Sequence, residues 1–385
     1  MNILFVSFDY PPLRGGIANL SYQVAKNLSE EDKLFIIAPA IKGAKEFDSK
    51  SQVITFRVTN IRGLREFALF FTMLYLISKL RIDVIYNLTW YPSGAVSYFV
   101  SILTRIPYIV QVYAMDYFED RRSIFNKLKY NWLRMLIKKL AFNRAKKIIT
   151  ISNFTKDRLI TRGVDALKIK IVFCGVDPNQ FKPDLDAKEV ILRYGLEDKK
   201  ILLTAARLDD YKGHDMVIKV LPKLITRFPA IRYLIVGDGP NEKNLKELVE
   251  KLSLSDYVIF TGWQDALLPL YYNACDIYIM LSREVYAEAK MEGFGVVFLE
   301  ASACAKPVIG GRSGGIPDAV IDQVTGLLVD PLNLDEIESA VTKVLSDKTY
   351  AEQLGAKGLD RIKREGLDWH SVSRKIREIL TEVKE

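Results

Sequence analysis

Two glutamates, Glu292 and Glu300, stand in the segment EAKMEGFGVVFLEAS, which covers residues 288–302. Gly293 and Gly295 disfavour a helix before the apolar run that follows them. The pattern therefore predicts Glu292 in a loop and Glu300 about a turn and a half inside a helix. Carboxylates accept hydrogen bonds from hydroxyl groups, so the pair suits a ligand that carries several of them.

The start of this helix is a candidate anion site. Its first backbone amides belong to Phe294, Gly295 and Val296. Such amides have no partner within the helix and favour negative charge. A nucleotide sugar would fit, with its phosphate at the amides and its ribose and sugar hydroxyls at the two carboxylates. Alternatively, Glu300 is a buried carboxylate that a structural partner satisfies, and the sequence leaves both interpretations open.

Arg207 and Lys212 follow the predicted strand 199–206, and Lys212 precedes Gly213 at a helix start. A forked guanidinium and a compact ammonium together suit a diphosphate. The alternative for such a pair is a solvated loop.

Gly15 and Gly16 follow the predicted strand 2–8 and precede a helix. A glycine pair lets the backbone approach a phosphate at the helix start. The dinucleotide motif G-x-G-x-x-G is not matched, which weakens a dehydrogenase interpretation. A simple tight turn is the alternative.

Two further strand ends carry weaker candidates. Backbone groups around Trp263 and Gln264, after the run FTGW, would suit a flat base. Tyr113 ends the predicted strand 107–112, and Asp116 lies in the loop that follows. Both are candidates because they stand at the carboxyl edge of a parallel sheet.

Residues 121–147 contain ten Lys and Arg and no acidic residue. Lys127, Arg134 and Lys138 share one face of a predicted helix, which suits anionic lipid headgroups. Nucleic acid is a rival partner, although no nucleic-acid-binding module accompanies the segment. A solvated charged helix is the structural alternative.

Short apolar strands alternate with helical patterns along the chain, which predicts an α/β fold. We expect two doubly wound Rossmann-like domains that face each other across a cleft, where such folds bind ligands. The expected boundaries are 1–182 for an acceptor-binding domain and 183–365 for a nucleotide-sugar-binding domain. A final helix within 366–385 is expected to cross back to the first domain.

Charge is divided unevenly between these halves. Residues 1–182 hold 28 Lys and Arg against 14 Asp and Glu, whereas the remainder holds 27 against 33. The first half therefore suits an anionic partner. The three cysteines are scattered, the two histidines have no metal-binding spacing, and the longest apolar run has 12 residues. We therefore expect a cytoplasmic protein with no disulfide framework, no metal and no membrane span.

Taken together, the motifs resemble a known enzyme family. The glycine pair after the first strand, R-x4-K-G at 207–213 and E-G-F-G-x4-E at 292–300 are similar to the retaining glycosyltransferases of the GT-B fold, glycosyltransferase family 4. Order and spacing agree along nearly the whole chain. The opening PPLRGGIANL also looks like members that mannosylate phosphatidylinositol lipids.

The resemblance implies roles for the candidates. Arg207 and Lys212 would hold the diphosphate of a UDP- or GDP-sugar, with Gly16 approaching it. Glu300 would bind the ribose, and Glu292 would bind the transferred sugar. The family typically needs no divalent metal. It retains the anomeric configuration by a front-face route in which the leaving phosphate assists the acceptor hydroxyl.

One position departs from the family pattern. Many members carry His-Gly-x-Asp/Glu where this chain has Tyr113-Ala114-Met115-Asp116. Tyrosine is a poor base at neutral pH, so Asp116 carries over better than Tyr113.

The sequence therefore predicts a glycosyltransferase at the inner face of the cell membrane, acting on a glycan, lipid or polyprenyl-linked hydroxyl. This function would serve cell-envelope or polysaccharide synthesis. A non-hydrolysing sugar-nucleotide epimerase of the same architecture is the alternative. An epimerase would convert its donor sugar without any acceptor.

Overall fold

The computed structural model describes residues 1–385 except 52, 114–126, 265 and 286–289, and it describes only the backbone of 127–131. The chain forms two compact units. Unit 1 comprises Met1–Cys174 and Trp369–Glu385, and unit 2 comprises Gly175–Asp368. The division falls earlier than the expected 182/183 boundary. The amide of Val176 donates to the carbonyl of Leu367 at 2.9 Å, which ties the connecting segment to unit 2.

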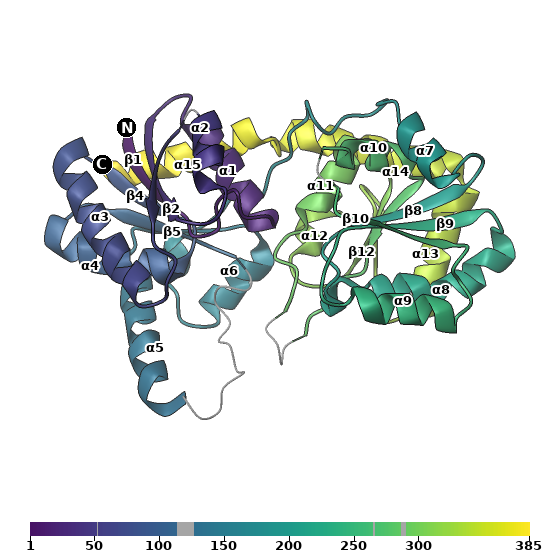
Figure 1. Ribbon diagram of the computed structural model, residues 1–385, viewed down its shortest axis with the longest axis horizontal. Coiled ribbons are helices and arrows are strands. Elements are labelled where there is room, and N and C mark those ends of the chain that lie inside the picture. Colours follow the sequence, from purple (N-terminus) through teal and green to yellow (C-terminus); the bar gives the residue numbers. More distant parts are fainter. Residues whose placement is uncertain (52, 114–126, 265, 286–289) are drawn as a thin grey trace. The chain divides into compact units, whose positions relative to one another are not determined.

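Unit 1 contains a parallel sheet in the order β3-β2-β1-β4-β5-β6-β7. Strands β1, β2, β4 and β5 of this sheet are labelled in Figure 1. Its strands are β1 (Asn2–Val6), β2 (Lys33–Pro39), β3 (Ile54–Val58), β4 (Val84–Asn87), β5 (Tyr108–Val112), β6 (Lys147–Thr150) and β7 (Ile169–Ile171). Strand β7 was not predicted, because three residues are too few for a clear apolar pattern.

The helices of unit 1 cover both faces of this sheet. They are α1 (Gly16–Leu28), α2 (Ala44–Lys50), α3 (Leu64–Leu80), α4 (Ala95–Thr104), α5 (Lys127–Arg144), α6 (Asn153–Ile160) and α15 (Trp369–Lys384), with short turns η1 (Trp90–Gly94) and η2 (Ala166–Lys168). Helix α3 contacts α4, and α4 contacts α5, whereas α1 contacts α15. Right-handed crossovers place α3, α4 and α5 on one face and α1 on the other.

Unit 2 contains a second parallel sheet in the order β10-β9-β8-β11-β12-β13. Its strands are β8 (Lys200–Ala205), β9 (Ile231–Val236), β10 (Val258–Gly262), β11 (Ile277–Met280), β12 (Val308–Gly311) and β13 (Leu327–Val329). Strand β8 lies within the predicted strand 199–206.

The helices of unit 2 alternate with these strands. They are α7 (Lys188–Tyr194), α8 (His214–Arg227), α9 (Glu242–Lys251), α10 (Leu268–Ala274), α11 (Val296–Ala303), α12 (Ile316–Ala319), α13 (Leu334–Ser346) and α14 (Lys348–Glu365), with a short turn η3 (Asp210–Lys212). The fold is thus the expected α/β class, with one doubly wound sheet in each unit.

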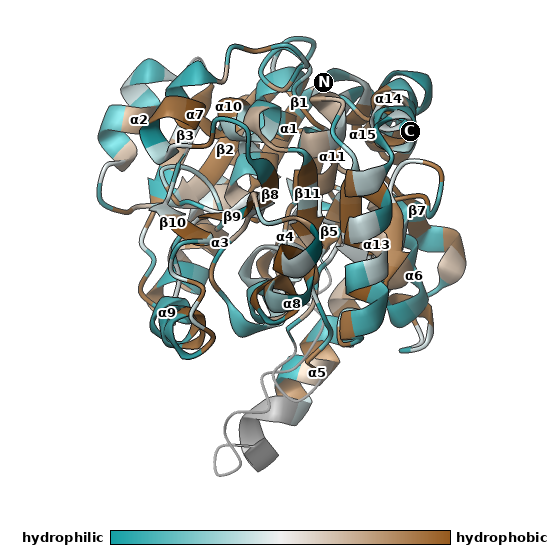
Figure 2. Ribbon diagram, turned by 90° about the vertical axis from the view of Figure 1, so that its right-hand side faces the viewer, coloured by the Kyte–Doolittle hydropathy of each residue, from teal (hydrophilic) through white to brown (hydrophobic). Residues whose placement is uncertain are grey.

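Each unit has its own apolar core. In unit 1, residues such as Val6, Leu69 and Val110 are fully buried between the sheet and α3–α5. In unit 2, Leu202 and Ile279 are among the buried residues that meet α8 and α13. Strands β8 and β11 are therefore largely hydrophobic in Figure 2, whereas α2 and α14 are mostly hydrophilic.

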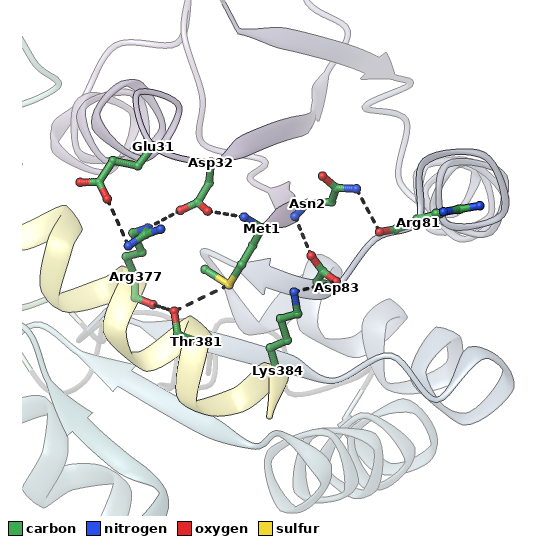
Figure 3. Close-up of polar contacts among 9 residues, drawn as sticks. All are labelled: Met1, Asn2, Glu31, Asp32, Arg81, Asp83, Arg377, Thr381 and Lys384. Carbon is green, nitrogen blue, oxygen red and sulfur yellow. Dashed lines mark hydrogen bonds and ion pairs between the residues drawn. The ribbon is translucent and has the colours of Figure 1, made fainter.

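Helix α15 follows unit 2 in the sequence but belongs to unit 1. The Arg377 guanidinium binds Asp32 at 2.7 Å and Glu31 at 3.1 Å, as Figure 3 shows. Asp32 also accepts from the amino group of Met1, and Lys384 pairs with Asp83 at 3.2 Å. These contacts fix the last helix to the amino end of the first sheet.

Candidate active site

The strand order of unit 2 reverses between β8 and β11, which are neighbours although they are far apart in the sequence. In open parallel sheets, ligands bind beyond the carboxyl ends of the strands at such a switch point. Arg207 and Lys212 follow β8, and Glu292 lies in the connection that follows β11. The sequence candidates of this half therefore meet at the expected edge of one sheet.

Lys212 and Glu292 form the central contact of this edge. The ammonium of Lys212 donates to Oε2 of Glu292 at 2.5 Å, with 14% and 16% of the two side chains exposed. Burial opposes the charged form of Lys212. The neighbouring Glu292 carboxylate and Tyr211 outweigh it, so the pKa of Lys212 lies above its ordinary value. Lys212 is thus a charged ammonium in a largely buried position.

The turn that carries Lys212 requires a glycine. Gly213 has a φ of 80°, and a Cβ there would lie 2.1 Å from the carbonyl oxygen of Leu281. Helix α8 begins directly after it at His214. The close approach of this turn to the end of β11 is what brings Lys212 within reach of Glu292.

Further ion pairs join the segments that follow β8 and β11, and the sequence analysis did not identify them. Arg283 binds Asp215 at 2.8 Å and donates to the carbonyl of Asp210 at 2.8 Å. Lys290 binds the carboxylate of Asp210 at 2.8 Å. Residues 210–215 after β8 and the connection after β11 are therefore held together by these ion pairs as well as by Lys212–Glu292.

The Glu292 backbone is fixed by a third loop. Its carbonyl accepts from the amide of Gly315 at 3.0 Å, and a Cβ on Gly314 would lie 2.3 Å from that oxygen. Helix α11 begins at Val296, after Gly295 in a left-handed conformation and the buried Phe294. The helix start, and with it the expected anion site, therefore lies directly after Glu292.

Glu300 is buried in α11, with 8% of the residue exposed. The hydroxyl of Tyr272 donates to its Oε2 at 2.8 Å. Burial raises the pKa of Glu300 to about 7, and the Tyr272 bond partly offsets that effect. Glu300 thus has a structural partner, as the alternative interpretation requires, while a carboxylate also remains at this position for a ligand.

Arg207 follows β8, whereas Trp263 and Gln264 follow β10, and β9 lies between these two strands. Arg207 is exposed and binds Asp209 at 3.2 Å. Trp263 and Gln264 follow β10 and are half-buried, and the Gln264 amide donates to the carbonyl of Thr261 at 3.0 Å. Of these three side chains, the Arg207 guanidinium is the most open to a ligand.

His214 is a buried residue of this region for which the sequence suggested no role. Neither of its ring nitrogens has a hydrogen-bond partner among the described residues. Burial and the nearby Lys212 lower its pKa to about 3, so the ring is neutral at pH 7.

In the described part of the chain, no three His, Cys, Asp or Glu side chains gather as metal ligands would.

The candidates of unit 1 occupy the edge of the first sheet. Gly15 precedes α1 with a φ of 139°, and Gly16 opens that helix. A Cβ on Gly16 would meet no atom within 4 Å, so packing does not require a glycine there. Tyr113 is buried directly after β5, whereas Asp116 lies outside the described residues.

The basic helix α5 lies against η1. The Arg134 guanidinium is 5.3 Å from the ring centre of Trp90 and 5.1 Å from that of Tyr91, and the Lys138 ammonium is 5.2 Å from Trp90. Such cation–π contacts fix both side chains on one face of α5. The side chain of Lys127 lies outside the described residues. No helix in the described ranges is long and apolar enough to cross a membrane.

Family models match most of the chain. Residues 14–180 match "Glycosyltransferase Family 4", and residues 186–361 match "Glycosyl transferases group 1". The GDP-mannose-dependent alpha-(1-6)-phosphatidylinositol monomannoside mannosyltransferase of Mycolicibacterium smegmatis is 31% identical over 365 residues, which cover 92% of each chain. Its counterpart of the same name in Mycobacterium tuberculosis is 28% identical over 98% of this chain and 97% of its own.

Solved structures share the whole fold. Anabaena HepE in complex with UDP is similar with a TM-score of 0.82 and 22% identity, over 99% of this chain and 100% of its own. Sucrose-phosphate synthase from Thermosynechococcus elongatus has a TM-score of 0.79 and 22% identity, over 99% of this chain and 98% of its own. At this identity the likeness establishes the two-domain fold.

Proposed function

The chain belongs to the group 1 glycosyl transferases of family 4, and on that premise we propose that it transfers a sugar from a nucleotide-diphosphate sugar to a lipid-linked hydroxyl with retention of configuration. The Lys212–Glu292 pair at the switch point of unit 2 carries the proposal. It sets a cation for phosphate beside a carboxylate for sugar hydroxyls, at the sheet edge where parallel folds bind ligands.

The donor diphosphate would lie between Arg207 and Lys212. Arg207 is exposed and offers a forked donor set, whereas Lys212 is a point charge in a drier position. A bound diphosphate would share or replace the Lys212–Glu292 contact. Glu292 would then accept hydrogen bonds from hydroxyls of the transferred sugar.

The remaining donor contacts extend from this pair. The amides of Phe294, Gly295 and Val296 would bind phosphate oxygens at the start of α11. Glu300 would bind ribose hydroxyls, and the backbone at Trp263 and Gln264 would contact the base.

The proposed roles in unit 1 concern the phosphate and the acceptor. Gly16 opens α1 without a packing reason for its missing side chain, which suits a close contact with a phosphate. Gly15 supplies the positive φ of the turn before it. Tyr113 would donate a hydrogen bond near the reacting sugar rather than accept a proton, and Asp116 would bind an acceptor hydroxyl.

In the proposed reaction, the bond between the anomeric carbon and the leaving phosphate breaks while the acceptor oxygen bonds to that carbon on the same face. The leaving phosphate takes the proton of the acceptor hydroxyl. Arg207 and Lys212 would stabilise the charge that develops on the phosphate. We propose that this pair acts in place of a divalent cation.

GDP-mannose and a phosphatidylinositol mannoside are the first donor and acceptor to test, because the two mycobacterial relatives carry these substrates in their names. UDP-sugars are the second choice of donor. Both matching family models describe glycosyltransferases, and both relatives are named mannosyltransferases. We therefore set the epimerase alternative aside. Lys127, Arg134 and Lys138 remain proposed contacts to anionic headgroups.

The decisive assay measures transfer of labelled mannose from GDP-mannose to a phosphatidylinositol lipid. We expect Glu292→Gln to lower kcat/KM by at least about 100-fold, because an interaction with the reacting sugar is lost. Glu247→Gln, on the exposed surface of α9, is the matched control and should be unchanged. Full activity of Glu292→Gln, or no transfer by the wild-type chain from any GDP- or UDP-sugar, would refute the proposal.

A further inference from the structure

Helix α3 is apolar on two opposite sides. Its inner side is buried in the core of unit 1 through Leu69 and Met73. Residues two positions away lie about 200° around a helix. Phe67 and Phe71, with Tyr75 one turn further, therefore point away from the core, and 68%, 63% and 60% of these residues are exposed.

The neighbouring helices continue this surface. Helix α4 contacts both α3 and α5, and all three cover the same face of the sheet. Phe99 and Leu103 of α4 and Trp132 of α5 are exposed as well. We call the six residues Phe67, Phe71, Tyr75, Phe99, Leu103 and Trp132 the apolar face of unit 1. Large exposed patches of this kind mark interaction surfaces.

The charge around the apolar face is positive. The sequences of α3, α4 and α5 contain one acidic residue, Glu66. Its carboxylate is engaged by the amide of Gly63 at 2.7 Å, by Arg65 at 2.8 Å and by the Tyr91 hydroxyl at 2.9 Å. Exposed basic residues on or next to these helices include Lys79, Arg105 and Lys139. The surface thus combines exposed aromatic rings with uncompensated positive charge.

We propose that the apolar face of unit 1 inserts into the interface of a lipid bilayer that carries anionic headgroups. Aromatic and aliphatic side chains enter the headgroup boundary while lysine and arginine side chains bind the phosphates. A second copy of the chain fits less well. A symmetric dimer would bring two such surfaces together, and unit 1 holds 31 Lys and Arg against 16 Asp and Glu.

Membrane insertion of this face rests on the proposed function, since a lipid-linked acceptor lies in a membrane. The contact is separate from the headgroup contacts proposed for Lys127, Arg134 and Lys138. Binding of the protein to vesicles requires neither donor nor turnover. Loss of vesicle binding and loss of transfer are therefore separate outcomes.

The test is co-sedimentation of the full chain with phosphatidylcholine vesicles that contain phosphatidylglycerol. We expect the triple variant Phe67→Gln, Phe71→Gln, Tyr75→Gln to bind at least about tenfold more weakly, because three aromatic side chains no longer leave water. Circular dichroism should match the wild type, since all three side chains are exposed. The matched control is Leu167→Gln, Leu192→Gln, Leu332→Gln, which removes three equally exposed apolar side chains outside this face and should bind as the wild type.

A second readout locates the contact without relying on affinity. Brominated lipids should quench part of the tryptophan fluorescence of the wild type, and Trp132→Phe should remove most of that quenching. Unchanged vesicle binding of the α3 variant would overturn the proposal. The proposal would also be overturned if the protein formed a dimer in free solution and the α3 substitutions dissociated this dimer without reducing vesicle binding. The apolar face of unit 1 would then be an interface between two copies of the chain.

Discussion

The described part of unit 1 exposes seventeen large hydrophobic side chains, whereas that of unit 2 exposes four. Both units are parallel sheets covered by helices, so their architecture does not explain the difference. Their charges differ as well. Unit 1 has a net charge of +15, and unit 2 has a net charge of −7.

The edges of the two sheets differ too, but here unit 2 has the more conspicuous feature. Unit 2 gathers charged side chains at its switch point, where Lys212, Glu292, Arg283 and Asp215 are paired. The described candidates at the edge of unit 1 are two glycines and Tyr113. The same scaffold therefore presents a cluster of charged side chains, our candidate site, in one unit and an apolar, basic surface in the other. This contrast supports locating function in sites rather than in the fold.

The largest expected effect contrasts glycines at the two sheet edges. Gly213→Ala should lower the free energy of unfolding by about 3 kcal/mol, because the new Cβ overlaps the carbonyl of Leu281 and the backbone conformation is left-handed. Hydrogen exchange in β8 and β11, followed by mass spectrometry, measures this change within unit 2.

Gly16→Ala in unit 1 is the matched control. No atom lies within 4 Å of the added Cβ, so the stability should change by no more than about 0.5 kcal/mol. Equal losses in the two variants would show that the edges are not built differently.

An intermediate effect concerns pH and unit 2. Glu300 has its pKa raised to about 7 in the fold, mainly by burial. Because the pKa is raised, the folded protein favours the protonated form of Glu300. This preference stabilises the fold below the unfolded pKa of the group, and the stabilisation is lost as pH rises through 7. Between pH 5 and pH 8, we expect the free energy of unfolding of the wild type to fall by about 2 kcal/mol more than that of Glu300→Gln.

Urea unfolding at several pH values checks the Glu300 prediction. Tyr272→Phe removes the one bond that offsets the burial of the carboxylate, and should therefore extend the loss to higher pH. A flat difference between wild type and Glu300→Gln across this range would contradict the assigned pKa.

The smallest effect tests whether α15 belongs energetically to unit 1. Arg377→Gln removes the contacts with Asp32 and Glu31, and should weaken protection of α15 amides by about 1 kcal/mol, since the guanidinium is partly exposed. Exchange in α14 of unit 2 should be unchanged. Equal loosening of both helices would mean that the two units do not separate at residue 369.

The fold class and most strands follow from the sequence, because buried parallel strands such as β8 and β9 are continuous apolar runs bounded by turns. The boundary near residue 182 was less accurate. Prolines and turn residues mark the connecting segment, but the bond from Val176 to Leu367 joins residues far apart in the sequence.

The candidate site was predictable only in part. Spacing and residue type indicate Arg207, Lys212 and Glu292, since each follows a strand of the same sheet. Arg283 and Lys290 were missed because their partners lie about 70 to 80 residues away and charged loop residues are common. The outward row of α3 was not recognised from the sequence, since a pattern that is apolar on all sides does not reveal which side meets the core.

The most direct test of the contrast between the units is titration calorimetry with GDP-mannose and with UDP-glucose. Lys212→Met should lower the affinity for the preferred donor by at least about 30-fold, because a charged contact to the diphosphate is lost. Lys243→Met, which is exposed on α9, and the triple variant Phe67→Gln, Phe71→Gln, Tyr75→Gln should keep it within about twofold. Unchanged donor affinity in Lys212→Met, or its loss in the α3 variant, would contradict the assignment of donor binding to unit 2.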